Sequence, residues 1–95
     1  MRDKREPIYG CIGERVKRAR EELGWSQEDI ASEVGMSRAS LANIELGKVR
    51  VSIHKLQDVA DVLGIPYSKL IPTRAEVQRS IKSKIRELQK ELEAQ

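Results

Sequence analysis

Aromatic residues, histidine and cysteine are scarce in this sequence. It has no Phe, aromatic residues make up 3% of its 95 positions, and there is one Cys and one His. A single Cys cannot form an intramolecular disulfide, and one Cys with one His does not supply the ligand set of a zinc site. Aliphatic side chains on helices must therefore build the core, and we expect neither a metal nor another cofactor.

Residue groups that carry catalysis are missing as well. No Ser/His/Asp group, paired-carboxylate cleft or phosphate-binding loop can be assembled around His54, so we do not expect an enzyme. No run approaches the roughly 20 apolar residues that a membrane-spanning helix needs, and the N-terminus lacks the apolar core of a signal peptide. Together with the lone Cys11, these absences predict a cytoplasmic protein without a membrane partner.

Charge, by contrast, is plentiful. Charged residues make up 35% of the chain, with a net charge of +3 and a pI near 9.2. These values permit a nucleic-acid partner, although a plain soluble protein could share them. The length suits one small domain with an appended element. We divide the chain into a flexible N-terminal arm at residues 1–10, a helical domain at residues 11–72 and a C-terminal helix at residues 73–95.

Two short helical patterns meet between Ser26 and Gly47. Apolar residues recur there at helical intervals, with Gly35 between the two patterns. A glycine supplies the left-handed turn that ends a helix, and Ser37 can cap the next helix with its hydroxyl. The stretch therefore predicts two helices joined by a turn of about three residues.

This stretch resembles the helix-turn-helix of the lambda-repressor-like, Cro-type (XRE) DNA-binding family. The resemblance covers roughly residues 12–71 and rests on spaced positions, namely Gln27, Ile30, Ala31, Val34, Gly35, Met36, Leu41, Ile44, Glu45 and Gly47. It implies an all-α fold, a five-helix lambda-repressor-like domain with an appended C-terminal helix, and double-stranded DNA as the partner. It also implies an ion pair between Arg20 and Glu45 that ties the first helix to the end of the DNA-reading helix. An ordinary helical hairpin is the alternative interpretation.

The helix that starts at Ser37 is the one that the resemblance places in the major groove. The guanidinium of Arg38 fits guanine O6 and N7, the amide of Asn43 fits adenine N6 and N7, and Ala39 offers a methyl contact to thymine. We therefore predict that bases are read by Ser37, Arg38, Ala39 and Asn43. The predicted phosphate contacts come from the preceding helix, the reading helix and the loop beyond it: Gln27, Ser40, Lys48 and Arg50.

A separate helix is predicted at the C-terminus. Thr73 to Glu76 has the form of a capping box, so a helix should start there and run to Glu93, about 30 Å. Its apolar residues form a narrow stripe, the last four spaced by 4, 3 and 4 residues as in a coiled-coil seam: Val77, Ile81, Ile85, Leu88 and Leu92. The stripe either packs on its own domain or meets its copy in a second subunit, and we favour the homodimer. Reading helices about 34 Å apart would then fit a palindromic operator.

The sequence thus favours a transcriptional regulator, specifically a repressor that occupies promoter DNA as a homodimer. The alternative is an antitoxin or adapter whose C-terminal helix binds a partner protein, such as a toxin or an antirepressor, with DNA binding secondary or absent. Phage repressors, restriction-modification controllers and antitoxins are not separated by the sequence.

Five other side chains have predicted places. We expect Trp25 to pack against the core, and Leu23 and Ile53 to lie on buried helix faces. Arg15 should point outward, and the solitary His54 should lie on the surface.

Overall fold

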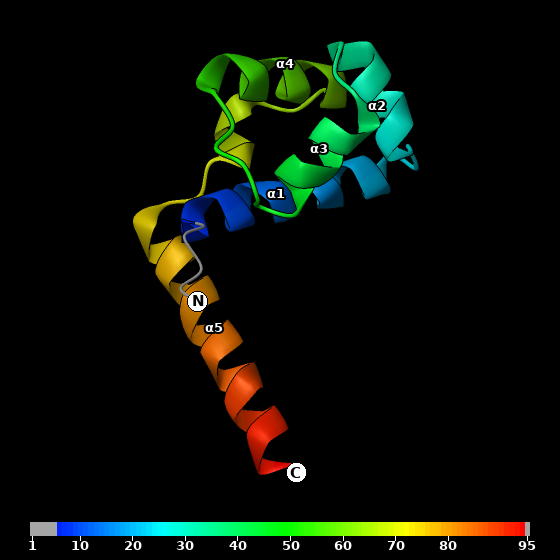
Figure 1. The fold of residues 1–95 in the computed structure, drawn as a ribbon. Coiled ribbons are helices and arrows are strands. Elements are labelled where there is room, and N and C mark those ends of the chain that lie inside the picture. The colour runs from blue at the N-terminus through cyan, green and yellow to red at the C-terminus, as the bar shows by residue number, and fades with distance from the viewer. Residues whose placement is uncertain (1–5, 95) are drawn as a thin grey trace.

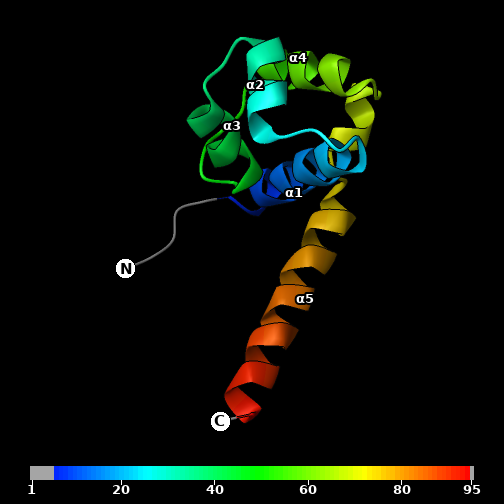
Figure 2. The same cartoon turned by 90° about the vertical axis from the view of Figure 1, so that its right-hand side faces the viewer.

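The computed structural model describes residues 6–94, which form helices joined by short links (Figure 1). The helices are, in chain order, α1 (Pro7–Glu22), α2 (Gln27–Val34), α3 (Arg38–Glu45), α4 (Ile53–Leu63), the short 3-10 helix η1 (Tyr67–Leu70) and α5 (Arg74–Glu93). Residues 6–94 contain no strand, so the all-α prediction is confirmed. The first four helices and η1 form a head, and α5 projects away from it (Figure 2).

Side-chain caps and a glycine set the ends of the central helices. At the start of α2, Ser26 accepts a hydrogen bond from the Asp29 N–H at 3.1 Å, and the Asp29 carboxylate accepts the Ser26 N–H at 2.9 Å. Ser37 begins α3 in the same way, because its hydroxyl accepts the Ser40 N–H at 3.0 Å. Gly35 ends α2 with a φ of +81°, a left-handed conformation that favours glycine. These contacts confirm the predicted boundaries of the two helices.

The core of the head is aliphatic, as the shortage of aromatic residues requires. Each element of the head contributes at least one fully buried side chain: Val16, Ile30, Leu41, Leu56, Val59 and Leu70. Burial of each such side chain stabilises the fold by about 1.5–3 kcal/mol. The inner face of α3 is therefore held by hydrophobic packing from its neighbours.

The backbones of α1 and of the end of α3 approach closely at glycines. A Cβ at Gly13 would overlap the main-chain carbonyls of Ile44 and Glu45. A Cβ at Gly47, just beyond α3, would lie 2.7 Å from the Cα of Gly10. The missing side chain of Gly13 thus lets α1 pack closely against the end of α3, and the missing side chain of Gly47 lets the turn beyond α3 approach Gly10.

This packing corrects the predicted arm at residues 1–10. α1 begins at Pro7, so residues 7–10 are helical. Proline is well suited to the first position of a helix, where its missing N–H would have no partner in any case. Residues 1–5 of the predicted arm lie outside the described residues.

Three apolar side chains are exposed where the sequence predicts burial, namely Leu23, Trp25 and Ile53. Leu23 and Trp25 lie beyond the last residue of α1, on either side of Gly24, whose φ is +72°. Ile53 is the first residue of α4. Helical periodicity is a poor guide at helix ends, because the chain direction changes there and the side chain lacks a neighbouring turn.

Arg15 fastens the start of α5 to the head, so its predicted outward position is wrong. Its Nη2 donates to Glu76 Oε2 at 2.8 Å, and its Nη1 donates to the carbonyls of Lys69 at 3.2 Å and Ile71 at 3.5 Å. The predicted capping box is present, with Thr73 accepting the Glu76 N–H and Glu76 accepting the Thr73 N–H. The Thr73 N–H, together with the Arg15 guanidinium, lowers the pKa of Glu76 to about 2.

The apolar stripe of α5 becomes more exposed with distance from the head. Val77 is half-buried, and the exposed fraction then rises through 37%, 49%, 59% and 71% at Ile81, Ile85, Leu88 and Leu92. Packing on the same domain therefore accounts for little more than Val77. Within residues 6–94, the other four side chains of the stripe are exposed to solvent.

Candidate nucleic-acid interface

α3 buries one face and presents the other to solvent. Leu41 and Ile44 are buried in the head, whereas Arg38, Ala39 and Ser40 in the first turn are exposed. Ser37, which caps the helix, is exposed as well, so three of the four predicted base readers are exposed. The geometry therefore leaves the N-terminal end of α3 free to approach another molecule.

The two serines at the start of α3 are hydrogen-bonded to each other. The Ser37 hydroxyl donates to the Ser40 hydroxyl at 2.9 Å while it caps the Ser40 N–H. In this arrangement the proton of the Ser40 hydroxyl remains available to a phosphate oxygen or a base. Ser37 is chiefly occupied in starting the helix.

A shallow groove of about 440 Å³ runs beside α3 and gathers polar side chains from three elements. Ser40 and the half-buried Asn43 come from α3, and Arg50 comes from the loop that follows it. Lys55 enters from the first turn of α4, three residues after the capping Ser52. Lys55 is not among the phosphate-binding residues predicted from the sequence. Its position, a cation in the first turn after the loop that carries Lys48 and Arg50, could have indicated it. Two cations, an amide and a hydroxyl suit a phosphodiester backbone.

The loop after α3 carries the predicted phosphate binders Lys48 and Arg50, both exposed. The Lys48 N–H donates to the Asn43 carbonyl at 3.0 Å, which holds the start of the loop against α3. Nη2 of Arg50 lies 2.8 Å from Oε1 of Glu6, and both side chains are well exposed. An exposed pair of this kind contributes at most about 1 kcal/mol, so a phosphate can replace the carboxylate.

A buried network fixes the orientation of α3. Nε and Nη2 of Arg20 donate to the two carboxylate oxygens of Glu45 at 2.7 Å and 3.1 Å, and Nη1 donates to the Trp25 carbonyl at 2.8 Å. The hydrogen bonds to Glu45 raise the pKa of Arg20 despite its burial. The predicted pair between Arg20 and Glu45 is therefore confirmed, and it joins α1 to the last turn of α3.

Gln27 belongs to the same network. Its Nε2 donates to Glu45 Oε1 at 3.0 Å, so one of its amide hydrogens already has a partner inside the protein. Glu28 and Asp29 follow in the same first turn of α2 and disfavour a phosphate there. The structure thus shows Gln27 as a residue that positions α3, and its phosphate contact stays a prediction.

Residues 6–94 hold no group of three His, Cys, Asp or Glu side chains that could bind a metal ion. His54 is exposed on α4, as predicted, with its Nε2 3.6 Å from Oδ2 of Asp58. In the same range, no helix is both long enough and apolar enough to cross a membrane.

Comparison with known proteins agrees with this geometry. The Helix-turn-helix family model HTH_3 matches residues 16–70. An uncharacterized HTH-type transcriptional regulator of Sinorhizobium medicae (strain WSM419) is 32% identical over 65 residues, which are 68% of this chain and 47% of that protein. The immunity repressor protein of Bacillus phage phi105 is 35% identical over 60 residues, 63% of this chain and 42% of the repressor. The chain thus spans about half the length of these curated relatives.

Among solved structures, the restriction-modification controller protein C.AhdI from Aeromonas hydrophila matches with a TM-score of 0.65 and 28% sequence identity. The match covers 66% of this chain and 96% of the controller. The family match extends from the middle of α1 to the end of η1 and so includes α2 and α3, the two helices of the motif. The chain belongs to the HTH_3 helix-turn-helix family, the Cro/C1-type DNA-binding transcription regulators.

Proposed function

We propose that this chain is a sequence-specific repressor that binds a palindromic operator in double-stranded DNA as a homodimer, with α3 in the major groove. The observation that carries the proposal is the exposed first turn of α3, held in one orientation by the buried pair of Arg20 and Glu45. Bidentate contacts to base edges require side chains in fixed positions. A helix anchored at its far end meets that requirement.

Base reading is assigned to four residues of α3 and its cap. Arg38 is the residue for a guanine, through O6 and N7, and Asn43 is the residue for an adenine, through N6 and N7. Ala39 contacts a thymine methyl, and Ser37 supplies a shorter polar contact at the start of the helix. Asn43 lies deeper than Arg38, on the wall of the groove beside α3, so it reads a base on that side.

Phosphate binding is assigned to the surroundings of the groove. Lys48, Arg50 and Ser40 contact the backbone, and Lys55 adds a fourth contact from α4. Gln27 reaches a phosphate with the amide hydrogen that Glu45 does not use. Because Arg38 is the one cation between residues 25 and 47, most of the non-specific attraction comes from these flanking groups.

Dimerisation and repression rest on two further observations. Four apolar side chains of the α5 stripe are exposed. In an isolated chain they would remain in contact with water, which is unfavourable in free energy compared with burial against a partner. A relative of similar sequence is named an immunity repressor protein, and a protein of similar structure is named a restriction-modification controller.

The test combines footprinting on the DNA upstream of the chain's own gene with a solution mass measurement. We expect two protected half-sites related by a dyad, and a mass twice that of the 10.8 kDa chain. A folded protein that shows no preference among duplexes at any ionic strength would refute sequence-specific binding. A tight complex with another protein through α5, formed by a chain that does not bind DNA, would instead support an antitoxin or adapter.

A further inference from the structure

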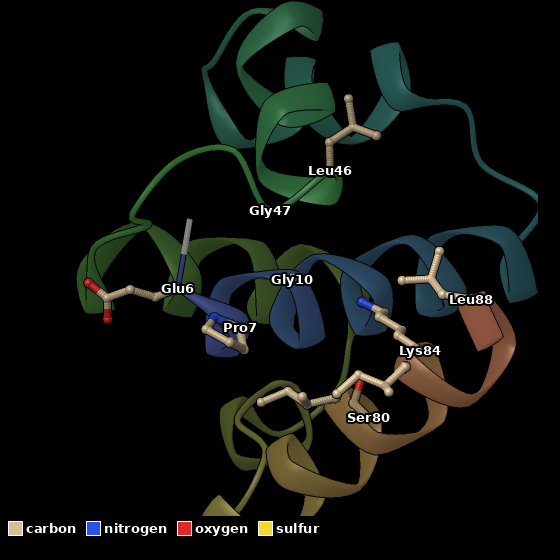
Figure 3. Close-up of a pocket in the computed structure, with 10 residues that line it drawn as sticks. Glu6, Pro7, Gly10, Leu46, Gly47, Ser80, Lys84 and Leu88 are labelled. Carbon is tan, nitrogen blue, oxygen red and sulfur yellow. The ribbon is translucent and has the colours of Figure 1, made fainter. Parts of the chain in front are cut away.

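The stripe of α5 continues into a groove at its base. The groove has a volume of about 350 Å³ and lies between α5, the start of α1 and the end of α3 (Figure 3). Pro7, Leu46 and Ile81 line its apolar part, and Leu46 is 59% exposed although it directly follows α3. Ile85 and Leu88 extend the same surface along α5. The groove, which Glu6, Ser80 and Lys84 also line, thus joins the apolar side chains of the head to the stripe of α5.

The spacing of the stripe is the same in both chain directions. Ile81, Ile85, Leu88 and Leu92 follow one another at intervals of 4, 3 and 4 residues. Two antiparallel copies of α5 therefore have one register that pairs every member. Ile81 meets the partner's Leu92, and Ile85 meets the partner's Leu88, as alternating positions do in a two-helix seam. Two parallel copies would also match, so apolar spacing alone does not fix the direction.

The charges of α5 decide between the two directions. Residues 74–86 carry five basic residues and one acidic residue, whereas residues 87–93 carry three acidic residues and one basic residue. A parallel pair would place the two basic segments side by side. An antiparallel pair places each basic segment against an acidic one, and in the register above Lys82 falls at the level of the partner's Glu91 and Arg86 at the level of the partner's Glu87. Like charges repel and opposite charges attract across such a seam, which favours the antiparallel pair.

We infer that α5 binds the α5 of a second copy in antiparallel orientation, with the partner's Leu92 seated in the groove beside Ile81 and Leu46. This inference rests on the homodimer proposed above and adds to it a direction, a register and a contact with the end of the reading helix. The contact matters because a seam of four apolar residues is short for a coiled coil. The groove extends the buried surface onto the head.

Cysteine cross-linking tests the direction. In a Cys11→Ala background, Ile81→Cys and Leu92→Cys are prepared separately and oxidised alone or as a mixture, with circular dichroism to verify the fold. A disulfide needs Cα atoms about 4.4–6.8 Å apart. In the antiparallel register the two copies of residue 81 are about 16 Å apart along the axis, at 1.5 Å per residue. We expect a disulfide-linked dimer in the mixture and none with either variant alone.

Leu46→Glu tests the contact with the head, with Leu23→Glu as the matched control. Both leucines are exposed, but Leu23 lies at the other end of α1 and does not line the groove. In sedimentation equilibrium, Leu46→Glu should weaken dimerisation at least tenfold, and Leu23→Glu should leave it unchanged. Equal effects of the two variants would refute the groove contact.

The outcomes separate this inference from the proposed function. If each cysteine variant cross-links with itself, the pair is parallel and only the direction is wrong. A monomer without cross-links in either experiment, or a stripe covered by a different protein, would refute both the antiparallel pair and the homodimer. Cross-linking in the mixture by a protein that does not discriminate between duplexes would support the pair and refute sequence-specific DNA binding.

Discussion

Removing the carboxylate of Glu45 should destabilise the head far more than removing an exposed one. The side chain of Glu45 is 2% exposed and that of Arg20 is 11% exposed. Glu45→Leu would leave the buried guanidinium with one hydrogen bond, to the Trp25 carbonyl. Breaking one side of a buried ion pair costs about 3–5 kcal/mol. Because Arg20 keeps that hydrogen bond and part of its side chain still contacts solvent, we expect the free energy of unfolding to fall by about 3 kcal/mol, the lower end of this range.

Urea and thermal unfolding, followed by Trp25 fluorescence, measure this loss. Trp25 is the single tryptophan, and its carbonyl accepts a hydrogen bond from Arg20, so its signal reports this corner of the head. At about 4–8 °C per kcal/mol, the melting temperature should fall by about 12–24 °C. The exposed Glu33 provides the control, since Glu33→Leu should change stability by less than about 0.5 kcal/mol.

A double variant separates stability from orientation. Arg20→Met combined with Glu45→Leu removes both charges and fills the space with apolar atoms, so most of the stability should return. Operator preference should not return, because α3 has lost its anchor to α1 and Gln27 has lost its partner. The reasoning is refuted if Glu45→Leu costs less than about 1 kcal/mol, or if the double variant discriminates between duplexes as well as the natural chain.

Four further predictions concern the interface, the helix packing and α5. Arg38→Ala should lower operator affinity by about 1–3 kcal/mol and relax discrimination at one base pair in gel-shift titrations, and the exposed Arg18→Ala should not. Lys48→Ala should weaken binding to operator and random DNA alike and flatten the salt slope by about one unit; identical behaviour of the Arg38 and Lys48 variants on both DNAs would contradict the assignment. Gly13→Ala should cost about 1–3 kcal/mol in urea unfolding, because its Cβ overlaps two carbonyls, and an unchanged midpoint would contradict the close approach. The pKa of Glu76 is lowered from 4.5 to about 2, so its stabilisation of the start of α5 is complete above pH 4.5 and lost as the pH falls towards 2. The protection of the α5 amides against exchange, corrected for the intrinsic exchange rate at each pH, should fall over that range, and Glu76→Gln should remove this pH dependence.

Local chemistry made the helix boundaries predictable. The side chains of Ser26, Ser37 and Thr73 each accept a hydrogen bond from an N–H group three residues later, and Gly35 ends α2 through its own backbone conformation. These helix ends therefore depend only on neighbouring residues, and the local sequence is enough to predict them. The pair of Arg20 and Glu45 spans 25 residues and was implied by the family resemblance, because spacing alone does not bring two such distant residues together.

Contacts between elements that lie far apart in the chain could not be predicted from the sequence. Arg15 meets Glu76 across 61 residues, and no periodicity in either helix reports that the other is near. Gly13 lets α1 approach the main-chain carbonyls of Ile44 and Glu45, and no local pattern in α1 predicts that contact. Lys55 joined the candidate interface only once the fold placed the first turn of α4 beside α3. Tertiary packing determines the surroundings of these residues, and local sequence preference does not predict it.

Because Arg15 fastens the start of α5 to the head, the length of that helix sets the direction in which its apolar stripe faces. Its first turn is clamped to α1 and η1, so every later turn has a set angular phase relative to the head. One residue inserted between Glu76 and Ile81 would rotate everything after it by about 100° about the helix axis and would aim the stripe at solvent on another side. Seven inserted residues would restore the phase and lengthen the spacer by about 10 Å. In the homodimer proposed above, natural variation in the length of this helix would therefore change which half-site separations fit the two reading helices.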